Sequence, residues 1–160
     1  MKLATLCYIQ NDQNQTLMMH RIKKENDMNE GKWNGLGGKF EQGESPEDCI
    51  IREVLEESGF TIQNPHLRGF LTFPDFDGKD DWYVFLFTAD QFSGEMIQSN
   101  EGNLEWIDND KLLELPLWEG DKHFLSWIAQ NKSFFSAKFN YVSKELDSHS
   151  VIFYPEKETD

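Results

Sequence analysis

The feature that most constrains this chain is a helix signal over about residues 46–58. Ser45 precedes Pro46 at the first helical position, and Asp48 is an approximate capping-box partner for Ser45. Gly59 is a good helix stop. Four apolar residues supply an inner face for the helix: Ile50, Ile51, Val54 and Leu55. A helix so marked at both ends must pack that face on a core.

A glycine-rich segment precedes this helix. Gly35, Gly37 and Gly38 give the backbone unusual conformational freedom, and a short strand is expected around Lys39 and Phe40. The glycine spacing matches neither the dinucleotide-binding fingerprint nor the Walker A motif. The sequence therefore argues against an NAD-binding protein and against an ATP-driven motor.

Three glutamates follow on the predicted helix. Glu53, Glu56 and Glu57 are related by three- and four-residue spacing, so their side chains converge on one face, with Arg52 at its edge. Like charges this close repel one another unless a cation binds, and carboxylate oxygens suit Mg²⁺. A solvated acidic helix face is the common alternative for such a cluster taken alone.

The rest of the chain predicts short strands and two further helices. Strands are expected at Leu3–Ile9, Thr16–Arg21, Arg68–Phe73, Trp82–Ala89, Leu104–Ile107, Ser133–Val142 and Ser150–Tyr154, and helices at Asn109–Leu115 and Asp121–Gln130. The first two strands flank a polar turn and are interpreted as a hairpin. Lys23–Lys32 is interpreted as a long, functional loop. A mixed sheet flanked by helices makes the fold α+β.

Length and charge limit the classes of protein. The 160 residues suit one domain over 1–160, with Glu156–Asp160 as a solvated tail. The formal charge of −14 disfavours binding along a nucleic-acid polymer. We find neither a bilayer-spanning segment nor a signal peptide, so no membrane association and a cytoplasmic location are expected.

Other metal sites find no support in the sequence. Cys7 and Cys49 lack zinc or disulfide spacing and are expected to be buried free thiols. The acidic loop Asp75–Asp80 has its glycine at the fourth place instead of the sixth and no glutamate at the twelfth. It therefore fails the EF-hand pattern for calcium.

The spacing around the glutamates resembles a known family signature. The matching positions are Gly38, Glu44, Arg52, Glu53, Val54, Glu56, Glu57, Gly59 and Phe60. Seven fixed types coincide by chance on the order of once in 10⁸ windows. The segment resembles the Nudix box, with Phe60 where the family usually has an aliphatic residue, so local repacking is expected there. The resemblance implies a Nudix fold, an α/β/α sandwich, and a phosphoanhydride hydrolase that uses Mg²⁺, with Mn²⁺ as an alternative.

The resemblance also implies roles for individual residues. In the family, glutamates matching Glu53, Glu56 and Glu57 hold the metal together with the carbonyl of the glycine matching Gly38. The arginine matching Arg52 orients a glutamate. Glu53, or a neighbouring glutamate such as Glu56, takes the proton of the attacking water, because family members differ in this base.

A further metal ligand of the family often lies in a later loop. Glu101, five residues before Trp106, resembles that glutamate in its placement. Its other interpretation is an ordinary turn residue, because a single residue is a thin motif.

A narrower resemblance concerns the substrate. The segments 33–39 and 117–121 resemble those of MutT-type oxidised purine nucleoside triphosphatases, especially the animal enzymes. There, the asparagine matching Asn34 hydrogen-bonds the purine, the tryptophan matching Trp118 stacks on it, and acidic residues read its edge. This chain has Gly120 where those enzymes have one of two adjacent aspartates, which leaves Glu119 and Asp121 as the acids available.

Two basic residues are candidates for contact with the phosphates: Lys39 and, more weakly, Arg21. Trp33 and Trp118 have a second interpretation as core aromatics.

The resemblance predicts hydrolysis of an oxidised purine dNTP such as 8-oxo-dGTP to the monophosphate and pyrophosphate, as in nucleotide-pool sanitation and DNA repair. One alternative is a Nudix hydrolase for another nucleoside diphosphate linked to a second moiety, such as a nucleotide sugar or dinucleoside polyphosphate. Another is a nucleotide-binding module without turnover. Protein partners are not predicted.

Overall fold

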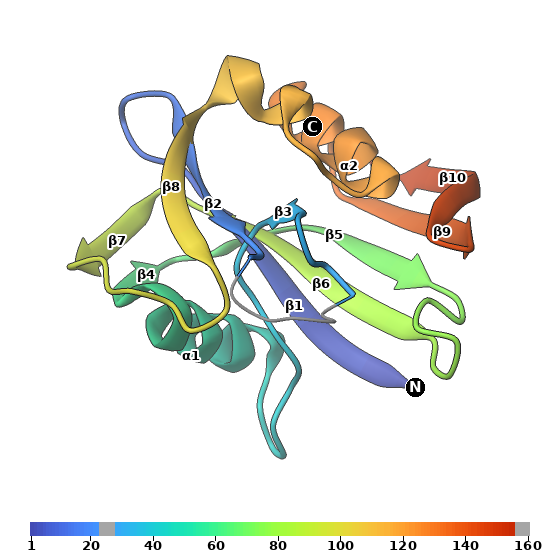
Figure 1. The fold of residues 1–160 in the computed structure, drawn as a ribbon, viewed down its shortest axis with the longest axis horizontal. Coiled ribbons are helices and arrows are strands. Elements are labelled where there is room, and N and C mark those ends of the chain that lie inside the picture. The colour runs from blue at the N-terminus through green and yellow to red at the C-terminus, as the bar shows by residue number, and fades with distance from the viewer. Residues whose placement is uncertain (23–27, 156–160) are drawn as a thin grey trace, which may run out of the picture.

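The computed structural model describes residues 1–22 and 28–155, which form three β-sheets, two α-helices and one 3₁₀ helix (Figure 1). Part of the expected loop Lys23–Lys32 and the expected tail Glu156–Asp160 lie outside the described residues. Within the described ranges, no helix is both long enough and apolar enough to cross a membrane.

The largest sheet has five strands in the order β1-β6-β5-β9-β10. Their bounds are β1 Lys2–Ile9, β6 Trp82–Ala89, β5 His66–Phe73, β9 Phe135–Val142 and β10 Glu145–Phe153. The pairs β1/β6 and β5/β9 are parallel and the other pairs are antiparallel, so the sheet is mixed. The α+β expectation is confirmed. The last strand starts at Glu145, five residues before the expected Ser150, because it pairs with β9 directly across a tight turn.

The expected hairpin between the first two strands is wrong. β1 takes β6 as its parallel partner, whereas β2 (Gln15–His20) joins a second sheet in the order β3-β2-β8. Direct pairing between the two segments is limited to one bridge, Gln10 with Thr16. β1 and β2 each pair along their length with strands distant in sequence, so the turn connects two sheets instead of closing a hairpin.

The second and third sheets use strands that are short or distant in sequence. β3 (Trp33–Asn34) and β8 (Asn103–Asp108) flank β2, and β4 (Phe60–Gln63) pairs with β7 (Gln91–Gly94). β3, β4 and β7 were not expected from the sequence. Phe60, the unusual aromatic, is buried with its ring 5.0 Å from that of Phe92.

The expected strand at Lys39 and Phe40 does not form. Lys39 makes a single bridge to Ala4, and the carbonyl of Lys39 accepts a hydrogen bond from Arg52 Nη2 at 3.1 Å. Phe40 N still donates to Leu3 O at 3.1 Å, so this segment contacts β1 through isolated bridges and not through a continuous strand ladder.

The first helix, α1 (Pro46–Ser58), has the expected bounds. Ser45 and Asp48 form a reciprocal capping box, since Asp48 N donates to Ser45 Oγ at 3.0 Å and Ser45 N donates to Asp48 Oδ2 at 3.1 Å. Gly59 ends the helix in the left-handed conformation, with φ of 83°. Leu55 differs from expectation because its side chain is exposed.

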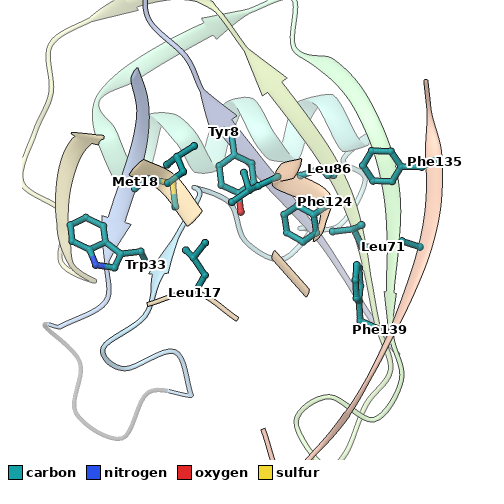
Figure 2. Packing of buried hydrophobic residues seen from close by; sticks show 12 residues of the cluster. Tyr8, Met18, Trp33, Leu71, Leu86, Leu117, Phe124, Phe135 and Phe139 are labelled. Carbon is teal, nitrogen blue, oxygen red and sulfur yellow. The ribbon is translucent and has the colours of Figure 1, made fainter. Parts of the chain in front are cut away.

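Alternate residues of β1 face the two α-helices. Tyr8 packs with Phe124 in one buried cluster (Figure 2), while Cys7 and Ile9 pack with Val54 of α1 in another. This alternation follows from the two-residue period of a strand. α1 and α2 (Glu119–Ala129) therefore cover opposite faces of the five-stranded sheet (Figure 1), which gives the expected sandwich. Cys7 is a buried free thiol, as expected.

The helices before the C-terminal strands differ slightly from expectation. The expected short helix is a 3₁₀ helix, η1 (Asn109–Glu114). α2 starts at Glu119, two residues before the expected Asp121. The earlier start places Trp118 at the N-cap and Asp121 within the first turn. The two residues are therefore held close together.

Candidate active site

Arg52 connects the acidic residues of α1. Its Nε and Nη2 donate to Glu44 Oε2 and Oε1 at 2.7 and 2.9 Å. Its Nη1 lies 2.8 Å from Glu53 Oε1 and 3.3 Å from Glu56 Oε2. The contacts hold the pKa of the Glu44 carboxyl down at about 2, mainly through the hydrogen bond from Arg52. Glu44 is therefore ionised and serves as a fixed anchor for the guanidinium.

Glu53 lies directly against the glycine-rich segment. An added Cβ on Gly38 would lie 2.5 Å from the Glu53 carboxyl carbon, so any side chain at this position would displace that carboxyl group. Partial burial raises the pKa of Glu53, and the Glu56 and Glu101 charges act in the same direction while Arg52 opposes them. In the described residues, Oε2 of Glu53 accepts no hydrogen bond, which leaves this oxygen open to a substrate-side group.

Glu57 is the most buried of the three helix glutamates. Its side chain turns toward the core, leaves 8% of its surface exposed, and accepts a hydrogen bond from Gly37 N at 3.0 Å. Burial, together with the nearby Glu101 charge, raises the pKa of Glu57 to about 8, although the hydrogen bond from the Gly37 amide acts in the opposite direction. A carboxyl in this position is costly to ionise without a cation beside it.

The Gly38 carbonyl, which was expected to help hold the metal, bonds to β1. It accepts hydrogen bonds from Thr5 N at 2.9 Å and from Thr5 Oγ1 at 3.3 Å, and the Cys49 thiol approaches it at 3.6 Å. These contacts fix the glycine segment against the strand. A cation would have to share this oxygen with them, so its metal role stays a prediction.

The loop before β8 brings Glu101 to the same side as the helix glutamates. The Glu101 charge raises the pKa of both Glu53 and Glu57, which shows that the three carboxyls are near one another. Glu101 Oε2 also lies 3.6 Å from Arg21 Nη1. Arg21 is therefore beside the acidic cluster, which is where a polyphosphate would need a positive charge.

The carboxylate oxygens of this acidic cluster suit a hard divalent cation, although they do not already surround a single metal position. Among residues 1–22 and 28–155, no three acidic, histidine or cysteine side chains already surround one point. The expected convergence on one face is thus incomplete, because Arg52 holds Glu53 and Glu56 while Glu57 turns inward. The buried Glu57 carboxyl and the carboxylate-only chemistry nevertheless fit Mg²⁺, which keeps several positions for water and phosphate oxygens.

A pocket of about 190 Å³ lies at the end of the large sheet, beside the N-terminus of α2. Its lining residues are Leu6, Met28, Asn29, Asn34, Phe73, Phe76, Trp82, Val84, Trp118 and Asp121. Three of the residues expected to bind the base, Asn34, Trp118 and Asp121, are brought together here. The wall is mainly apolar and aromatic with a few polar groups, as is usual for a small-molecule site.

Trp118 is held on several sides. Its Nε1 donates to Asn29 Oδ1 at 2.6 Å, its ring lies 5.0 Å from the Phe76 ring at a T-shaped angle, and Lys32 Nζ is 5.2 Å from its centroid. Only 5% of the residue is exposed, so the core interpretation of Trp118 holds in part. The remaining exposed surface faces the pocket.

Asp121 and Asn34 contribute buried polar groups to the same pocket. Burial raises the pKa of Asp121 to about 7, with the Lys32 charge acting against it. Asn34 Oδ1 is buried and has no hydrogen-bond partner among the described residues. An unpaired buried amide oxygen costs free energy unless a ligand donates to it.

Tyr8 lies close enough to Asp121 to feel its charge but does not line this pocket, and no sequence pattern singled it out. Its hydroxyl is buried without a hydrogen-bond partner in the described residues, and the pKa of Tyr8 is raised by burial and by the nearby Asp121 charge. In sequence terms Tyr8 is one more apolar residue of β1. Phe76, Asn29 and Met28 were also missed, because each comes from a loop with no local pattern.

Gly120 allows a close approach between α2 and β9. Gly120 N donates to the Tyr141 hydroxyl at 2.7 Å, and an added Cβ would lie 2.8 Å from that oxygen and 3.0 Å from a Phe139 ring carbon. A second aspartate has no room here. Of the two acidic residues expected beside Gly120, only Asp121 lines the pocket.

Three residues expected to contact the substrate do not line this pocket, which we call the base pocket after the residues expected to bind the base. The Glu119 side chain is 59% exposed and pairs with Lys122 at 3.1 Å. Lys39 Nζ lies 6.0 Å from the centroid of Trp82, which does line the pocket. Arg21 is at the acidic cluster instead. The structure therefore places Lys39 beside the pocket, Arg21 beside the acidic cluster, and Glu119 on the surface.

Sequence comparison assigns the family. A NUDIX domain model matches residues 1–128, which is most of the 160-residue chain. The chain belongs to the Nudix family and is a MutT-type Nudix pyrophosphohydrolase. Members of this family act on nucleotide substrates and generally use divalent metals.

Individual relatives cover nearly the full length. An uncharacterised Nudix hydrolase from Bacillus subtilis, YvcI, is 35% identical over 153 residues and covers 92% of each chain. An oxidised purine nucleoside triphosphate hydrolase from Mus musculus is 32% identical over 130 residues, covering 81% of this chain and 80% of the relative. A crystal structure of a MutT protein from Bacillus halodurans has a TM-score of 0.84 at 33% identity, covering 94% of this chain and 97% of that one.

Proposed function

We propose that this enzyme hydrolyses an oxidised purine deoxynucleoside triphosphate, such as 8-oxo-dGTP, to the monophosphate and pyrophosphate, using Mg²⁺. The single observation that carries the proposal is the meeting of Asn34, Trp118 and Asp121 around one pocket. The mouse relative, whose name specifies oxidised purine nucleoside triphosphates, supports the same substrate class.

The pocket has the chemistry that a purine needs. Trp118 offers an aromatic surface to stack on, and Asn34 Oδ1 accepts a hydrogen bond from a ring or exocyclic N–H. Asp121, with its pKa near 7, presents either a carboxylate or a carboxylic acid to the base edge near neutral pH. Oxidation of guanine at C8 turns N7 from an acceptor into a donor, so a site rich in acceptors favours the oxidised base.

The acidic cluster supplies the groups for hydrolysis. Glu53 accepts the proton of the attacking water through Oε2, since Arg52 Nη1 already engages Oε1. Its raised pKa makes it a stronger base than an ordinary carboxylate. Arg52, anchored by Glu44, keeps Glu53 in orientation. Arg21 and Lys39 attract the triphosphate.

Glu53, Glu56, Glu57 and Glu101 are the residues that would hold the metal, with the Gly38 carbonyl as a further candidate. When bound, Mg²⁺ stabilises charge on the phosphate oxygens and increases the hydroxide character of a bound water. A divalent cation held by these carboxylates would offset part of the negative charge with which this chain otherwise repels a polyanion.

A substrate panel tests the assignment. Turnover of dGTP and 8-oxo-dGTP would be compared under identical Mg²⁺, with a nucleotide sugar and a dinucleoside polyphosphate in the same panel. We expect the largest kcat/KM for 8-oxo-dGTP and release of pyrophosphate. Turnover of the nucleotide sugar with two monophosphate products, or of no triphosphate, would refute the proposal.

Glu53→Gln tests the proposed base. The amide keeps the size of the side chain but cannot accept a proton, so we expect kcat to fall by roughly 10²–10⁴-fold. Glu47→Gln, an exposed acid of the same helix, is the matched control and should keep full activity. Unchanged turnover by Glu53→Gln would remove Glu53 from the base role.

A further inference from the structure

A second concave site lies away from the acidic cluster and the base pocket. Its volume is about 710 Å³, within the ~300–1,000 Å³ typical of ligand pockets. Its lining residues are His66, Leu67, Arg68, Asn131, Lys132, Ser133, Phe134, Tyr154 and Pro155. None of these residues contributes to the site described above.

The two pockets lie at opposite ends of β5 and of α2. Arg68 is near the start of β5, and Phe73 at the end of β5 lines the base pocket. At ~3.3 Å per residue, the five steps between Arg68 and Phe73 correspond to roughly 16 Å. Lys132 likewise follows the C-terminal end of α2, while Trp118 precedes its start. The second pocket therefore has its own independent lining.

Two basic side chains, Arg68 and Lys132, line this pocket. Arg68 donates from Nε to Thr88 Oγ1 at 2.8 Å and from Nη1 to Asn131 Oδ1 at 3.4 Å, so it is oriented by neutral oxygens. Within the described residues, neither Arg68 nor Lys132 has a carboxylate within 4.0 Å. In a chain with 29 acidic and 15 basic residues, two such cations in one pocket are unusual.

The pocket also presents two exposed aromatic rings. Phe134 is 38% and Tyr154 is 52% exposed, and their centroids are 6.0 Å apart. Tyr154 N donates to Phe134 O at 2.7 Å, which ties the two residues together. Exposed rings beside an oriented guanidinium provide both a stacking surface and an anion contact.

The last group is His66. Its pKa is lowered by partial burial and by the neighbouring Arg68 charge, while Asp90 raises it. The imidazole is therefore neutral near pH 7 and adds a polar contact without adding charge. The charge of the pocket comes from Arg68 and Lys132.

We propose that this second pocket binds a purine mononucleotide, with the phosphate at Arg68 and Lys132 and the base against Phe134 and Tyr154. The volume accommodates one mononucleotide, and Arg68 and Lys132, which have no carboxylate within 4.0 Å among the described residues, match the charge of one phosphate monoester. A nucleic-acid polymer is disfavoured, because the chain carries a formal charge of −14 and would repel the remaining phosphates.

Chemical-shift mapping of the full chain tests the proposal. The probe is dGMP, titrated into ¹⁵N-labelled protein without divalent cations or phosphate buffer, with deoxyguanosine and inorganic phosphate in parallel. We expect saturable shifts of the Arg68, Ser133 and Phe134 amides with dGMP. Each fragment alone should bind at least ~10-fold more weakly, since it lacks half of the contacts.

Charge variants separate this pocket from the base pocket. Arg68→Ala/Lys132→Ala should weaken dGMP binding at this pocket by at least ~10-fold and leave any shifts of the Trp118 and Asp121 amides unchanged. Lys111→Ala/Lys138→Ala removes two exposed charges elsewhere and should change neither. If the first variant is poorly folded, Lys132→Glu alone, at an exposed position, should produce the same loss.

The proposal would be overturned if this pocket showed no shifts up to millimolar dGMP, or if its affinity were unchanged after loss of both cations. Binding of deoxyguanosine as tightly as dGMP would exclude the phosphate contact and also overturn it. Binding of inorganic phosphate as tightly as dGMP would exclude the aromatic contact, with the same consequence. Because the readout is binding and not turnover, failure of the proposed enzymatic substrate would leave this test unaffected.

Discussion

The Arg52 guanidinium donates two hydrogen bonds to the Glu44 carboxylate, from Nε to Oε2 at 2.7 Å and from Nη2 to Oε1 at 2.9 Å. Glu44 precedes α1 and Arg52 lies in its middle, so the contact ties the loop to the helix. The same guanidinium reaches Glu53 through Nη1 at 2.8 Å. The position of the proposed base thus depends on a residue nine positions earlier in the chain.

Arg52→Lys should separate this positioning from simple charge. Lysine keeps the charge but cannot make the planar two-point contact. Charge-assisted hydrogen bonds contribute about 1.5–3 kcal/mol, so we expect kcat to fall roughly 10–100-fold. Glu41→Gln is the control, because Glu41 lies 3.6 Å from Arg52 and is 66% exposed. Steady-state kinetics in which Arg52→Lys matches the unmodified enzyme would contradict the prediction.

Removal of the metal should lower stability through Glu57. A bound cation at a hundredfold excess over Kd stabilises the fold by about 2.7 kcal/mol. For a chain of this size that corresponds to a rise in Tm of roughly 5–10 °C. Thermal melts with Mg²⁺ and with a chelator measure the rise. Glu57→Gln should lose most of it while Glu47→Gln keeps it, and an equal rise in both variants would argue against Glu57 as a ligand.

The pKa of Asp121 predicts a pH dependence of stability. Burial raises this pKa from 3.8 to about 7 in the folded chain, so the folded state holds the proton more tightly than the unfolded state. The resulting stabilisation is fully present below pH ~4 and is lost as the pH rises through ~7. The quantity to compare is the free energy of unfolding of the unmodified protein minus that of the Asp121→Asn variant. We expect this difference to be about 2 kcal/mol larger at pH 5 than at pH 8.

Urea unfolding at the two pH values measures this difference. Subtracting the two free energies of unfolding at each pH cancels the contribution of every other group that titrates in the same way in both proteins. A difference that does not change between pH 5 and pH 8 would mean that Asp121 titrates far from neutrality.

Gly120→Ala should destabilise the chain although helix propensity predicts the opposite. Alanine in a helix is favoured over glycine by about 0.8–1.0 kcal/mol. Here, however, the added Cβ would lie 2.8 Å from the Tyr141 hydroxyl. We expect a net loss of about 1–2 kcal/mol in chemical unfolding. Tyr141→Phe removes the hydroxyl, so the double variant should recover part of the loss; a more stable single variant would refute the steric explanation.

Trp118→Ala distinguishes a base-stacking residue from a core residue. Loss of stacking costs about 1–3 kcal/mol per base, so KM for the preferred purine triphosphate should rise roughly 10–100-fold. Trp118→Phe keeps an aromatic ring and should cause a smaller rise. Both variants also lose packing, which thermal melts report separately. A lower Tm with unchanged KM would assign Trp118 to the core alone.

Local patterns predicted α1 almost to the residue. Ser45, Asp48 and Gly59 act through hydrogen bonds and backbone angles within one turn of the helix end, so their effect does not depend on the rest of the fold. The hairpin prediction failed for the opposite reason. Pairing of β1 with β6 joins residues about 80 positions apart, and no local pattern encodes that partner.

The candidate site divides in the same way. Regular spacing along α1 predicted the order of Glu53, Glu56 and Glu57, because helix geometry is periodic. Their unequal environments were not predictable: Glu57 is buried and Glu56 is exposed, since the β1 side of the helix is covered and the other is not. Likewise, only packing shows that Gly120 faces the Tyr141 hydroxyl.

The sequence by itself determined the helix, its caps and the chemical types of the acidic cluster, since these depend on neighbours within a few residues. The tertiary structure alone decided that Asn34, Trp118 and Asp121 line one pocket and that Arg68 and Lys132 line another. Both pockets join residues that are distant in sequence. They form because the strands and helices bury their apolar faces against elements far away along the chain.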